Sequence, residues 1–493
     1  MPCPIPRVCV AAVAFLAATQ SFAEDRSPSV ATSLEDPPNV IVIFTDDQGY
    51  GDVGCFGATG FQTPNLDRMA SEGTRFTDFY VSQAVCSASR ASLLTGCYNV
   101  RVGITGALGP QATIGLHPDE VTFGDLAKTQ DYATAMFGKW HLGDEPGLLP
   151  TSQGFDEYYG LPYSNDMWPL HPNQRKTPDG KGANYPPLPM IRNGEVYDSE
   201  VTAKEQTQLT TEYTERAVAF IDEHADEPFL LYVAHSMPHV PLYVSDKFGG
   251  TQESGLYGDV IAEIDWSVGQ ILDAVRKRGL SEKTLTVFCS DNGPWLAYGA
   301  HAGSAGPFRE GKGTTFEGGV RTPAIMWMPG QIPAGRVCET PAMTIDLFPT
   351  IANLIGASLP DRTIDGRDLW AVMTDHPQAA PTHEALFFYW GNELQAVRWG
   401  KWKLHYPHSY RSLVTEGENG LPGKYTRPTI ERSLFDLDAD EGETTNVIDQ
   451  HPDVAAAIDA MAAEMRTELG DRLQKIDGKA IRPVGRVDET AAR

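Results

Sequence analysis

Two pairs of oxygen-bearing side chains stand where apolar runs of the sequence end. Asp46-Asp47 follows the run 39–44, and Asp291-Asn292 follows the run 285–290. Three carboxylates and one amide oxygen form a hard oxygen donor set, which suits Ca²⁺ first and Mg²⁺ second. Either pair alone could be a solvated turn or a helix cap, because Asp and Asn favour both. Together they predict a metal site, provided that the two runs end at the same place in the fold.

A potential nucleophile lies between these pairs. Cys86 begins the segment Cys86-Ser87-Ala88-Ser89-Arg90, which continues in small and apolar residues as far as Gly96. A helix over this segment would place Arg90 one turn from Cys86, where its charge could hold a nucleophile. Taken alone, the segment is more typical of a buried core thiol, since free cysteine behaves as a small hydrophobic residue. Whether Cys86 is a nucleophile or a core thiol depends on how many other residues of a catalytic site the chain carries.

Further residues that could do chemistry are cationic or titratable. Lys139 and His141 stand two positions apart, which alone is more typical of a surface loop. His239 follows the apolar run 229–234, and His235 is close enough to compete with it; either could be a structural histidine at a strand end. The formal net charge of −26 argues against a nucleic-acid partner, because phosphates require a basic surface. If several cationic side chains lie together in one site of such an acidic chain, the function of that site must account for them.

The elements that must position these residues alternate between strands and helices. The runs 39–44, 229–234 and 285–290 are continuously apolar, which is typical of strands buried on both faces of a parallel sheet. Between 260 and 279 apolar residues recur at helical spacing, and Thr63-Pro64 is typical of a helix start. This alternation predicts an α/β fold with a large, mostly parallel sheet sandwiched by helices. Open α/β sheets bind ligands at the carboxyl ends of their strands, where the oxygen pairs stand.

The sequence changes in character towards its C-terminus. Short runs such as 386–389 and 402–406, separated by Gly and Pro, predict a small antiparallel sheet, and a last helix over roughly 452–473 would pack on it. The length of 493 residues also exceeds what one hydrophobic core normally supports. We therefore predict a catalytic α/β domain over 24–380 and a smaller C-terminal α+β subdomain over 381–493.

The N-terminus has the composition of a cleavable secretory signal. Arg7 precedes the apolar run 8–18, and Ser21-Phe22-Ala23 fits cleavage after Ala23, so that the signal comprises residues 1–23. No later apolar stretch reaches membrane length, so we expect no membrane span and export to a bacterial periplasm or the medium. That compartment permits disulfides, but their pairing cannot be read from the sequence. Outside the signal, and apart from Cys86, the cysteines that could form disulfides are Cys55, Cys97, Cys289 and Cys338.

Taken together, the segments resemble the sulfatase family, and in motif style its arylsulfatase A group. The resemblance spans Asn39 to about Pro323, with Ala88 where the commonest family pattern has proline. Besides the oxygen pairs and the cysteine segment, it rests on Gly138-Lys139-Trp140-His141-Leu142-Gly143, Pro162-Tyr163-Ser164-Asn165-Asp166, Pro238-His239-Val240-Pro241, Gly311-Lys312-Gly313-Thr314-Thr315 and Glu317-Gly318-Gly319-Val320-Arg321.

The resemblance implies an alkaline phosphatase-like fold and a cysteine that is oxidised after translation. Cys86 would become formylglycine through a formylglycine-generating enzyme, which would be a partner during maturation. Ca²⁺, or alternatively Mg²⁺, would be the cofactor. The implied metal ligands are Asp46, Asp47, Cys86, Asp291 and Asn292.

The resemblance also implies a role for each remaining residue. One hydroxyl of the hydrated formylglycine, held by Arg90 and deprotonated by Asp291, would attack sulfur. His141 would deprotonate the second hydroxyl, which would release the sulfate, and His239 or Lys312 would protonate the leaving oxygen. The implied substrate-binding residues are Ser164, Lys139, His239 and Lys312.

We therefore predict a sulfuric ester hydrolase for a small-molecule or glycan sulfate ester; whether the ester is aryl or carbohydrate stays open, as does the oligomeric state. A phosphate or phosphonate monoester hydrolase of the same superfamily is the alternative, although such enzymes commonly use two metals with extra His and Asp ligands. A non-catalytic binder of sulfated glycans would have lost at least one chemical residue, and all are present. The substrate rim is expected from 165–193 and from the segment near His405; the first of these contains Trp168, His171, Arg175 and Lys176.

Overall fold

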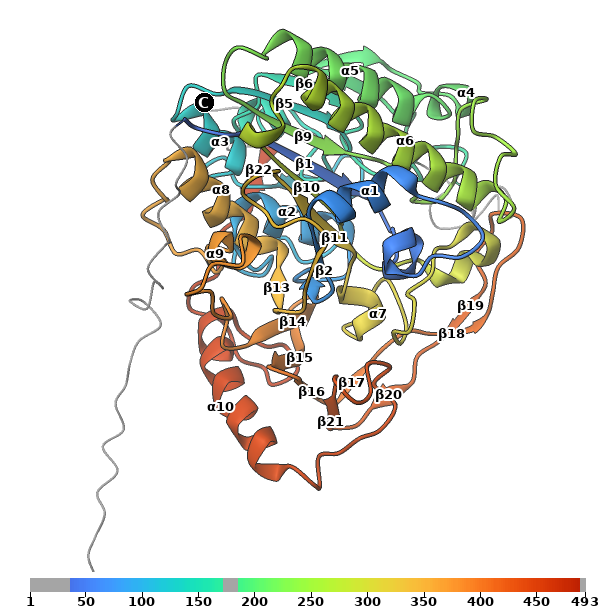
Figure 1. Cartoon of the computed structure of the whole chain (residues 1–493). Coiled ribbons are helices and arrows are strands. Elements are labelled where there is room, and N and C mark those ends of the chain that lie inside the picture. Colours follow the sequence, from blue (N-terminus) through green and yellow to red (C-terminus); the bar gives the residue numbers. More distant parts are fainter. Residues whose placement is uncertain (1–35, 172–184, 488–493) are drawn as a thin grey trace, which may run out of the picture.

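A ten-stranded sheet forms the centre of the computed structural model, which describes residues 36–171 and 185–487 (Figure 1). The predicted signal over 1–23 lies outside the described residues. The strand order is β12-β2-β11-β10-β1-β9-β5-β6-β7-β8. These strands are β1 (Asn39–Thr45), β2 (Thr74–Phe76), β5 (Ala133–Gly138), β6 (Glu157–Gly160), β7 (Met190–Arg192), β8 (Glu195–Asp198), β9 (Phe229–Ala234), β10 (Thr284–Ser290), β11 (Ala324–Trp327) and β12 (Arg336–Cys338).

The middle of the sheet is parallel, as the apolar runs predict. Strands β10, β1, β9, β5 and β6 pair in parallel, whereas β11 against β10 and β2, and β7 against β6 and β8, are antiparallel. The register sets Thr45 beside Ser290 and Phe44 beside Ala234. The backbone amide of Asp291 donates to the carbonyl of Thr45 at 3.0 Å. The two predicted oxygen pairs therefore leave adjacent strands at the same level.

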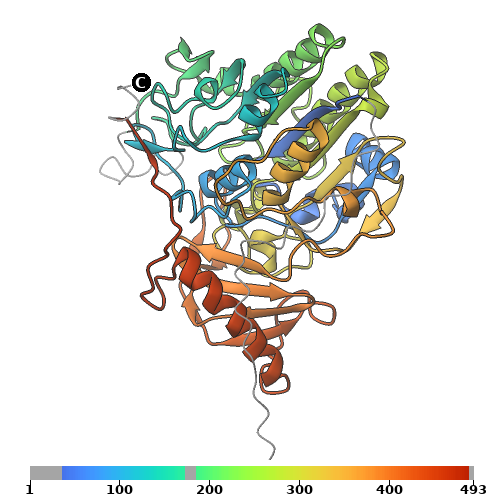
Figure 2. The same ribbon diagram turned by 90° about the vertical axis from the view of Figure 1, so that its left-hand side faces the viewer.

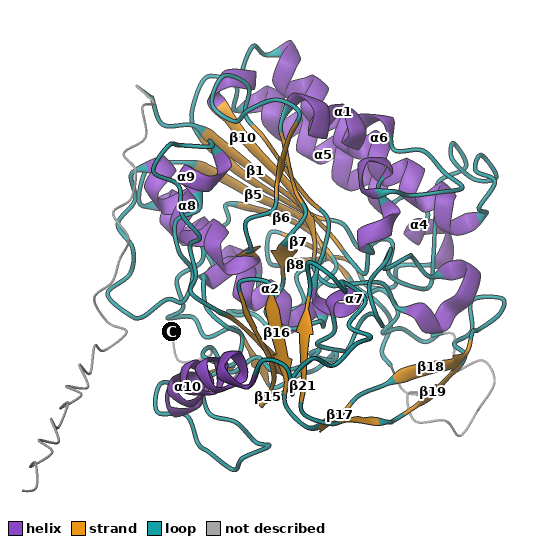
Figure 3. Cartoon of the chain, turned by 60° about the horizontal axis from the view of Figure 1, so that its bottom comes forward, coloured by secondary structure: helices purple, strands orange, loops and turns teal. Residues whose placement is uncertain are grey.

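Helices cover both faces of the sheet (Figure 3). Val40 and Phe44 of β1 belong to one buried cluster, and Ile41 and Ile43 belong to the other, because successive side chains of a strand point to opposite faces. One face packs against α1 (Pro64–Glu72), α5 (Leu209–Glu223) and α6 (Leu256–Lys277). The opposite face packs against α2 (Cys86–Thr95), α3 (Phe123–Lys128), α8 (Leu347–Ile355) and α9 (Trp370–Met373).

A second, four-stranded antiparallel sheet follows, with a long helix packed on it (Figure 2). It consists of β14 (Leu386–Trp390), β15 (Glu393–Trp399), β16 (Trp402–His405) and β21 (Ser433–Asp436). The helix α10 (Pro452–Leu469) is shorter than the predicted 452–473. It ends at Leu469 because Gly470 takes a φ of 79° and its amide caps the carbonyl of Arg466. The remaining short elements are β3 (Phe79–Tyr80), β4 (Ile114–Gly115), α4 (Ala203–Gln206), α7 (Glu317–Val320), β13 (Ala342–Met343), β17 (His408–Ser409), β18 (Ser412–Thr415), β19 (Lys424–Thr426), β20 (Thr429–Ile430) and β22 (Gly485–Arg486).

A hairpin of the C-terminal part reaches back to the main sheet. Strands β18 and β19 pair with each other and project away from the four-stranded sheet, at the right of Figure 1. The amides of Gly417 and Gly423 both donate to the carbonyl of Ala297, at 2.9 and 2.7 Å. Ala297 lies only a few residues beyond the end of β10, so the hairpin is fastened close to the carboxyl edge of the sheet.

Buried ion pairs join the main domain to the four-stranded sheet. Glu317, at the start of α7, receives the ammonium group of Lys403 on β16 at 2.8 Å and the guanidinium of Arg321 at 3.2 Å. Lys403 also lies 3.2 Å from Glu443, which accepts a contact from His405 at 2.7 Å. We call Glu317, Arg321, Lys403, His405 and Glu443 the interface cluster. Its members are buried.

Five cysteines of the described residues are free, namely Cys55, Cys86, Cys97, Cys289 and Cys338. The question of pairing that the sequence left open is thus answered for the described part of the chain, which contains no disulfide. In the same residues, no helix combines the length and the apolar composition needed to cross a membrane.

Candidate active site

The carboxyl ends of five neighbouring strands deliver most of the predicted site. In the order β10, β1, β9, β5 and β6, each strand is followed by polar residues that are buried. These are Asp291 and Asn292, then Asp46 and Asp47, then His239, then Lys139 and His141, and lastly Ser164. Because parallel strands end at one edge, residues spread over almost 250 positions converge there.

The backbone at this edge is closely packed. Gly138 ends β5 with a φ of 120°, and a Cβ there would lie 1.8 Å from the carbonyl oxygen of Ala234. Only glycine fits, and the next amide, that of Lys139, donates to the same oxygen at 2.8 Å. Asp47 and His141 occupy the left-handed region with φ of 65° and 63°, which is uncommon outside glycine and tends to occur at functional sites.

Cys86 is the first residue of α2 and points at the strand ends. Its Sγ lies 3.3 Å from Oδ1 of Asp46 and 3.5 Å from Nζ of Lys312, and its side chain is almost inaccessible. Burial, and then the negative charge of Asp46, raise the pKa of the thiol far above its ordinary value. The encoded cysteine is therefore protonated at neutral pH and a poor nucleophile.

Three cations pair with the three carboxylates of the site. Lys312 Nζ lies 2.6 Å from Oδ1 of Asp47, Arg90 Nη2 lies 2.9 Å from Oδ2 of Asp291, and Lys139 Nζ contacts Oδ2 of Asp46. Burial would raise the pKa of Asp46, but the positive charge of Lys139 and its neighbours outweighs it and keeps this pKa well below its usual range. Burial, followed by the charge of Asp46, raises the pKa of Asp291 to about 7.

The donor set fits a hard divalent cation. One oxygen each of Asp46 and Asp47 lies within 4.8 Å of the other and of Cys86 Sγ and a ring nitrogen of His239. Asn292 donates from Nδ2 to Asp47 at 2.8 Å, which leaves its buried Oδ1 without a hydrogen-bond partner. A buried amide oxygen of this kind is costly unless it has a ligand. Asp291 is adjacent, with Oδ1 accepting the amide of Asp47 at 3.0 Å.

The structure separates the two histidines that compete after β9. His239 Nε2 lies 3.6 Å from Oδ2 of Asp47, inside the site. His235 contacts Ser267 of α6 at 3.2 Å, so it faces the helical layer instead. His141 contacts the carbonyl of Leu108 through Nε2 at 2.7 Å. Its buried Nδ1 has no partner.

The predicted rim is only partly correct. His405 is buried in the interface cluster and stacks on Phe316 with the ring centroids 4.7 Å apart, so it does not line a rim. A C-terminal residue does reach the site, but it is Arg411, whose Nε donates to the carbonyl of Lys312 at 2.7 Å. Arg175 and Lys176 lie outside the described residues.

Trp168 and His171 lie close to the site, on the segment that follows Ser164. Asp166 connects His171 to the site, because its Oδ2 lies 3.4 Å from His171 and its carboxylate interacts electrostatically with His239 and Lys139. Oδ1 of Asp166 and Nε1 of Trp168 are buried without partners. Ser164 itself accepts from Lys139 Nζ at 3.2 Å.

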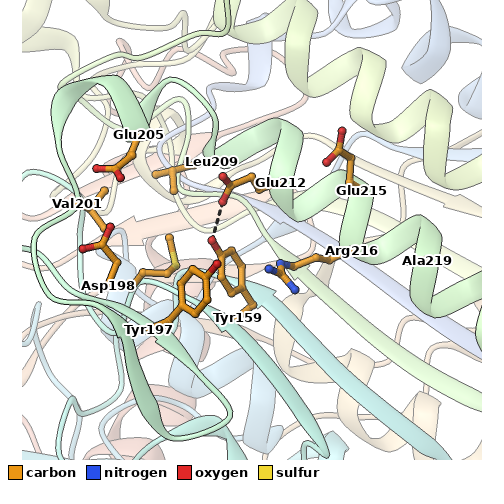
Figure 4. A pocket seen from close by; sticks show the side chains of 11 residues that line it. Tyr159, Tyr197, Asp198, Val201, Glu205, Leu209, Glu212, Glu215, Arg216 and Ala219 are labelled. Carbon is orange, nitrogen blue, oxygen red and sulfur yellow. Dashed lines mark hydrogen bonds between the residues drawn. The ribbon is translucent and has the colours of Figure 1, made fainter.

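A cavity of about 510 Å³ lies apart from these residues, between α5 and the edge strands (Figure 4). Its walls carry Asp198, Glu205, Glu212 and Glu215 against one cation, Arg216, and Tyr159 donates to Glu212 at 2.6 Å. With four carboxylates and one guanidinium, the net negative charge of these walls disfavours an anionic ester. This cavity is therefore not the place where such a substrate reacts.

Comparison with known proteins gives the family. The model of the sulfatase family matches residues 38–357, and that of the C-terminal region of aryl-sulfatase matches 381–483. Arylsulfatase A of Bos taurus is 38% identical over 457 residues, covering 88% of this chain and 87% of the relative. N-acetylgalactosamine-6-sulfatase of Canis lupus familiaris is 40% identical over 400 residues, covering 76% and 73%. The chain belongs to the sulfatase family.

Solved structures agree with this assignment. The PsFucS1 sulfatase from Pseudoalteromonas sp. superposes with a TM-score of 0.79 and 28% identity, covering 91% of this chain and 92% of the other. A phosphonate monoester hydrolase of Agrobacterium radiobacter has a TM-score of 0.61 at 20% identity, covering 87% and 95%, which shows a common fold only. The chain is accordingly a sulfatase, an enzyme that hydrolyses sulfate esters.

Proposed function

We propose that this sulfatase acts through formylglycine derived from Cys86, with Ca²⁺ bound beside it. The observation that carries the proposal is the contact of Cys86 Sγ with both Asp46 and Lys312, at 3.3 and 3.5 Å. A nucleophile at this position meets a carboxylate that belongs to the metal donor set and a cation that can bind an anionic ester. We propose Mg²⁺ as the second choice of metal.

The proposed metal ligands are Asp46, Asp47, Asp291, Asn292 and the modified residue 86. A bound Ca²⁺ would supply positive charge that polarises an ester oxygen and acidifies a hydroxyl group. Asp46, Asp47 and Asp291 are each already paired with a cationic side chain. The charge of the ion would therefore leave the site positive, as the binding of an anionic ester requires.

Modification of residue 86 would supply a hydrated aldehyde, that is, two hydroxyl groups on one carbon. Arg90 holds Asp291 at 2.9 Å, so this carboxylate faces the first turn of α2. As a carboxylate beside residue 86, Asp291 would accept the proton of the attacking hydroxyl group. Arg90 would thus orient both the nucleophile and its base.

The sulfate group would be bound by the cations around residue 86. Lys139, Ser164, Lys312 and His239 would donate to its oxygens, and His239 or Lys312 would protonate the departing alcohol. Burial, followed by the positive charge of Lys312, lowers the pKa of His239. The unpartnered Nδ1 of His141 would accept the proton whose removal ends the covalent intermediate.

Residues 24–380 would form the catalytic domain, and 381–493 the C-terminal subdomain. Removal of 1–23 as a signal would send the enzyme to a periplasm or the medium after a formylglycine-generating enzyme has acted on Cys86. The natural substrate would be a carbohydrate or aryl sulfate. The name of the Canis lupus familiaris relative, N-acetylgalactosamine-6-sulfatase, supports the carbohydrate sulfate.

The test compares hydrolysis of 4-nitrophenyl sulfate and 4-nitrophenyl phosphate. The enzyme is produced together with a formylglycine-generating enzyme, and the modification is verified by peptide mass. Cys86→Ala is the inactive reference, and Cys289→Ala is the matched control because that buried thiol lies on β10 outside the site. Sulfate turnover that disappears in Cys86→Ala and in chelator supports the proposal. Turnover of the phosphate alone would favour the phosphoryl-transfer alternative, and turnover by unmodified protein would refute the role of formylglycine.

A further inference from the structure

Trp295 is the meeting point of three cationic or titratable side chains. It follows Asn292 by three residues and is half-buried. Its ring centroid lies 5.6 Å from that of His239 and 4.5 Å from Nζ of Lys312. The guanidinium carbon of Arg411 lies 5.8 Å from the same ring. The indole therefore forms a wall that begins at the proposed sulfate site and ends at Arg411.

Arg411 comes from the opposite end of the chain, immediately before β18. Its Nε and Nη2 both donate to the carbonyl oxygen of Lys312, and its guanidinium lies 5.3 Å from the ring centroid of Tyr425. Burial lowers the pKa of Arg411, and the negative charge of Asp47 opposes this shift, so Arg411 lies within the electrostatic field of the site. The fastening of the hairpin to Ala297 fixes this position.

Among the described residues, the guanidinium of Arg411 donates to the carbonyl of Lys312 through Nε and Nη2, and no carboxylate lies within 4.0 Å of it. The other cations of the site differ, since Arg90, Lys139 and Lys312 each have a carboxylate partner. A partly buried guanidinium without a carboxylate partner is less favourable than a paired one, because the partial desolvation of its charge is not compensated. A ligand that brings its own anionic group would compensate it.

We propose that Arg411 determines specificity by binding a second anionic group, a carboxylate or a further sulfate, on a carbohydrate whose reacting sulfate lies at residue 86. This inference rests on the proposed function and names its substrate class. The Nη1 edge would donate to the anionic oxygens, a role that suits the planar guanidinium. The exposed part of the Trp295 ring would lie against the sugar between the two anionic groups.

A purely structural role for Arg411 has a different consequence. Two of its donors already hold the carbonyl of Lys312, so its removal could displace Lys312 and impair every substrate equally. A binding role weakens only those substrates that carry the second anionic group. The ratio of kcat/KM between two substrates separates these roles, since misplacement of Lys312 cancels in that ratio.

The experiment uses the modified full-length enzyme and three substrates. These are 4-nitrophenyl sulfate, a 6-sulfated N-acetylhexosamine linked to a uronic acid, and the same hexosamine carrying two sulfates. Arg411→Gln keeps one donor for the Lys312 carbonyl but removes the charge, and Arg411→Lys restores the charge. Lys424→Gln, on the exposed side of β19, is the matched control.

We expect Arg411→Gln to lower the ratio of kcat/KM for a substrate with two anionic groups to kcat/KM for the aryl sulfate. The ratio should fall about 10- to 100-fold through a higher KM for the substrate with two anionic groups, as for the loss of a charged hydrogen bond. Arg411→Lys should recover part of that loss, and Lys424→Gln should leave the ratio unchanged. Whichever anionic group shows the larger fall identifies the second group. An unchanged ratio, with kcat lowered for all substrates, would overturn the proposal in favour of the structural role. Absence of any sulfate turnover by verified, modified wild-type enzyme would instead refute the proposed function, and this inference with it.

Discussion

Replacement of Lys403 by methionine tests how much the interface cluster stabilises the protein. The side chain is fully buried and its ammonium group lies 2.8 Å from Glu317 and 3.2 Å from Glu443. Methionine keeps most of the volume and removes the charge. The substitution therefore leaves two buried carboxylates without the cation that they share, which is the case in which a broken buried ion pair is most costly.

The expected magnitude can be obtained in two ways. Burial would raise the pKa of Glu317, but the positive charge of Lys403, followed by Arg321 and Arg398, lowers it from 4.5 to about 2. This net difference in pKa, in which the three cations outweigh burial, corresponds to about 3 kcal/mol of stabilisation. Removing one partner of a buried pair typically costs about 3–5 kcal/mol. We expect Lys403→Met to lower the free energy of unfolding by about 3 kcal/mol at pH 7.

The pH dependence follows from the sign of the shift. The pKa of Glu317 is lower in the folded state than in the unfolded state, so its contribution is fully present above about pH 4.5 and is lost as pH falls towards about 2. The difference between wild type and Lys403→Met should therefore be largest at neutral pH and should shrink in acid. Urea titrations at pH 7 and pH 3, followed by tryptophan fluorescence, measure it, because Trp402 is adjacent.

The matched control is Lys401→Met, two residues earlier. Lys401 pairs with Asp436 at 2.6 Å, but its side chain is 42% exposed, and surface pairs contribute about 0–1 kcal/mol. A loss below about 1 kcal/mol in Lys403→Met, equal to that in the control, would refute the argument from burial.

Three further predictions concern the site. Asn292→Ala should weaken Ca²⁺ binding on the order of 10-fold or more, because the substitution removes a ligand oxygen. Calorimetric titration of the demetallated enzyme with Ca²⁺ measures this affinity, and an unchanged affinity would exclude Asn292 as a ligand. Ser164→Ala should lower kcat/KM about 5-fold, as for one hydrogen bond of about 1 kcal/mol, and steady-state kinetics would reveal an unaffected enzyme if Ser164 were idle. Chelation should lower both activity and melting temperature, with recovery on addition of Ca²⁺; a melting temperature indifferent to chelator would contradict the metal site.

Much of the fold follows from simple patterns in the sequence. The run 39–44 is apolar at every position because β1 is covered on both faces, and this property needs no knowledge of its neighbours. Its polar continuation, Asp46 and Asp47, could be assigned to a ligand-binding edge because parallel strands end together. Helix ends were less predictable, since the end of α10 depends on the backbone conformation of Gly470.

The parts that the sequence did not predict depend on long-range packing. His235 and His239 follow the same strand, and only the position of α6 shows which of them faces the site. Arg411 contacts Lys312 across 99 positions, and no spacing or motif connects the two. Trp295 follows the end of β10 closely in the sequence, and this closeness to a strand end could have indicated that Trp295 lies near the site. The segment near His405 was expected at the rim, and within it the ring of His405 is buried against Phe316 whereas Arg411 reaches the site.

The enclosure of Cys86 limits when it can be modified. Its side chain is about 2% exposed, and Lys312, one of the residues that cover it, is 226 positions further along the chain. An enzyme that alters the thiol must reach it before these residues have packed. At about 5–20 residues per second, synthesis of the intervening segment takes about 10 to 45 s. Under the proposed modification of Cys86, maturation would compete with folding during biosynthesis, and a variant that folds faster around α2 would carry more unconverted cysteine.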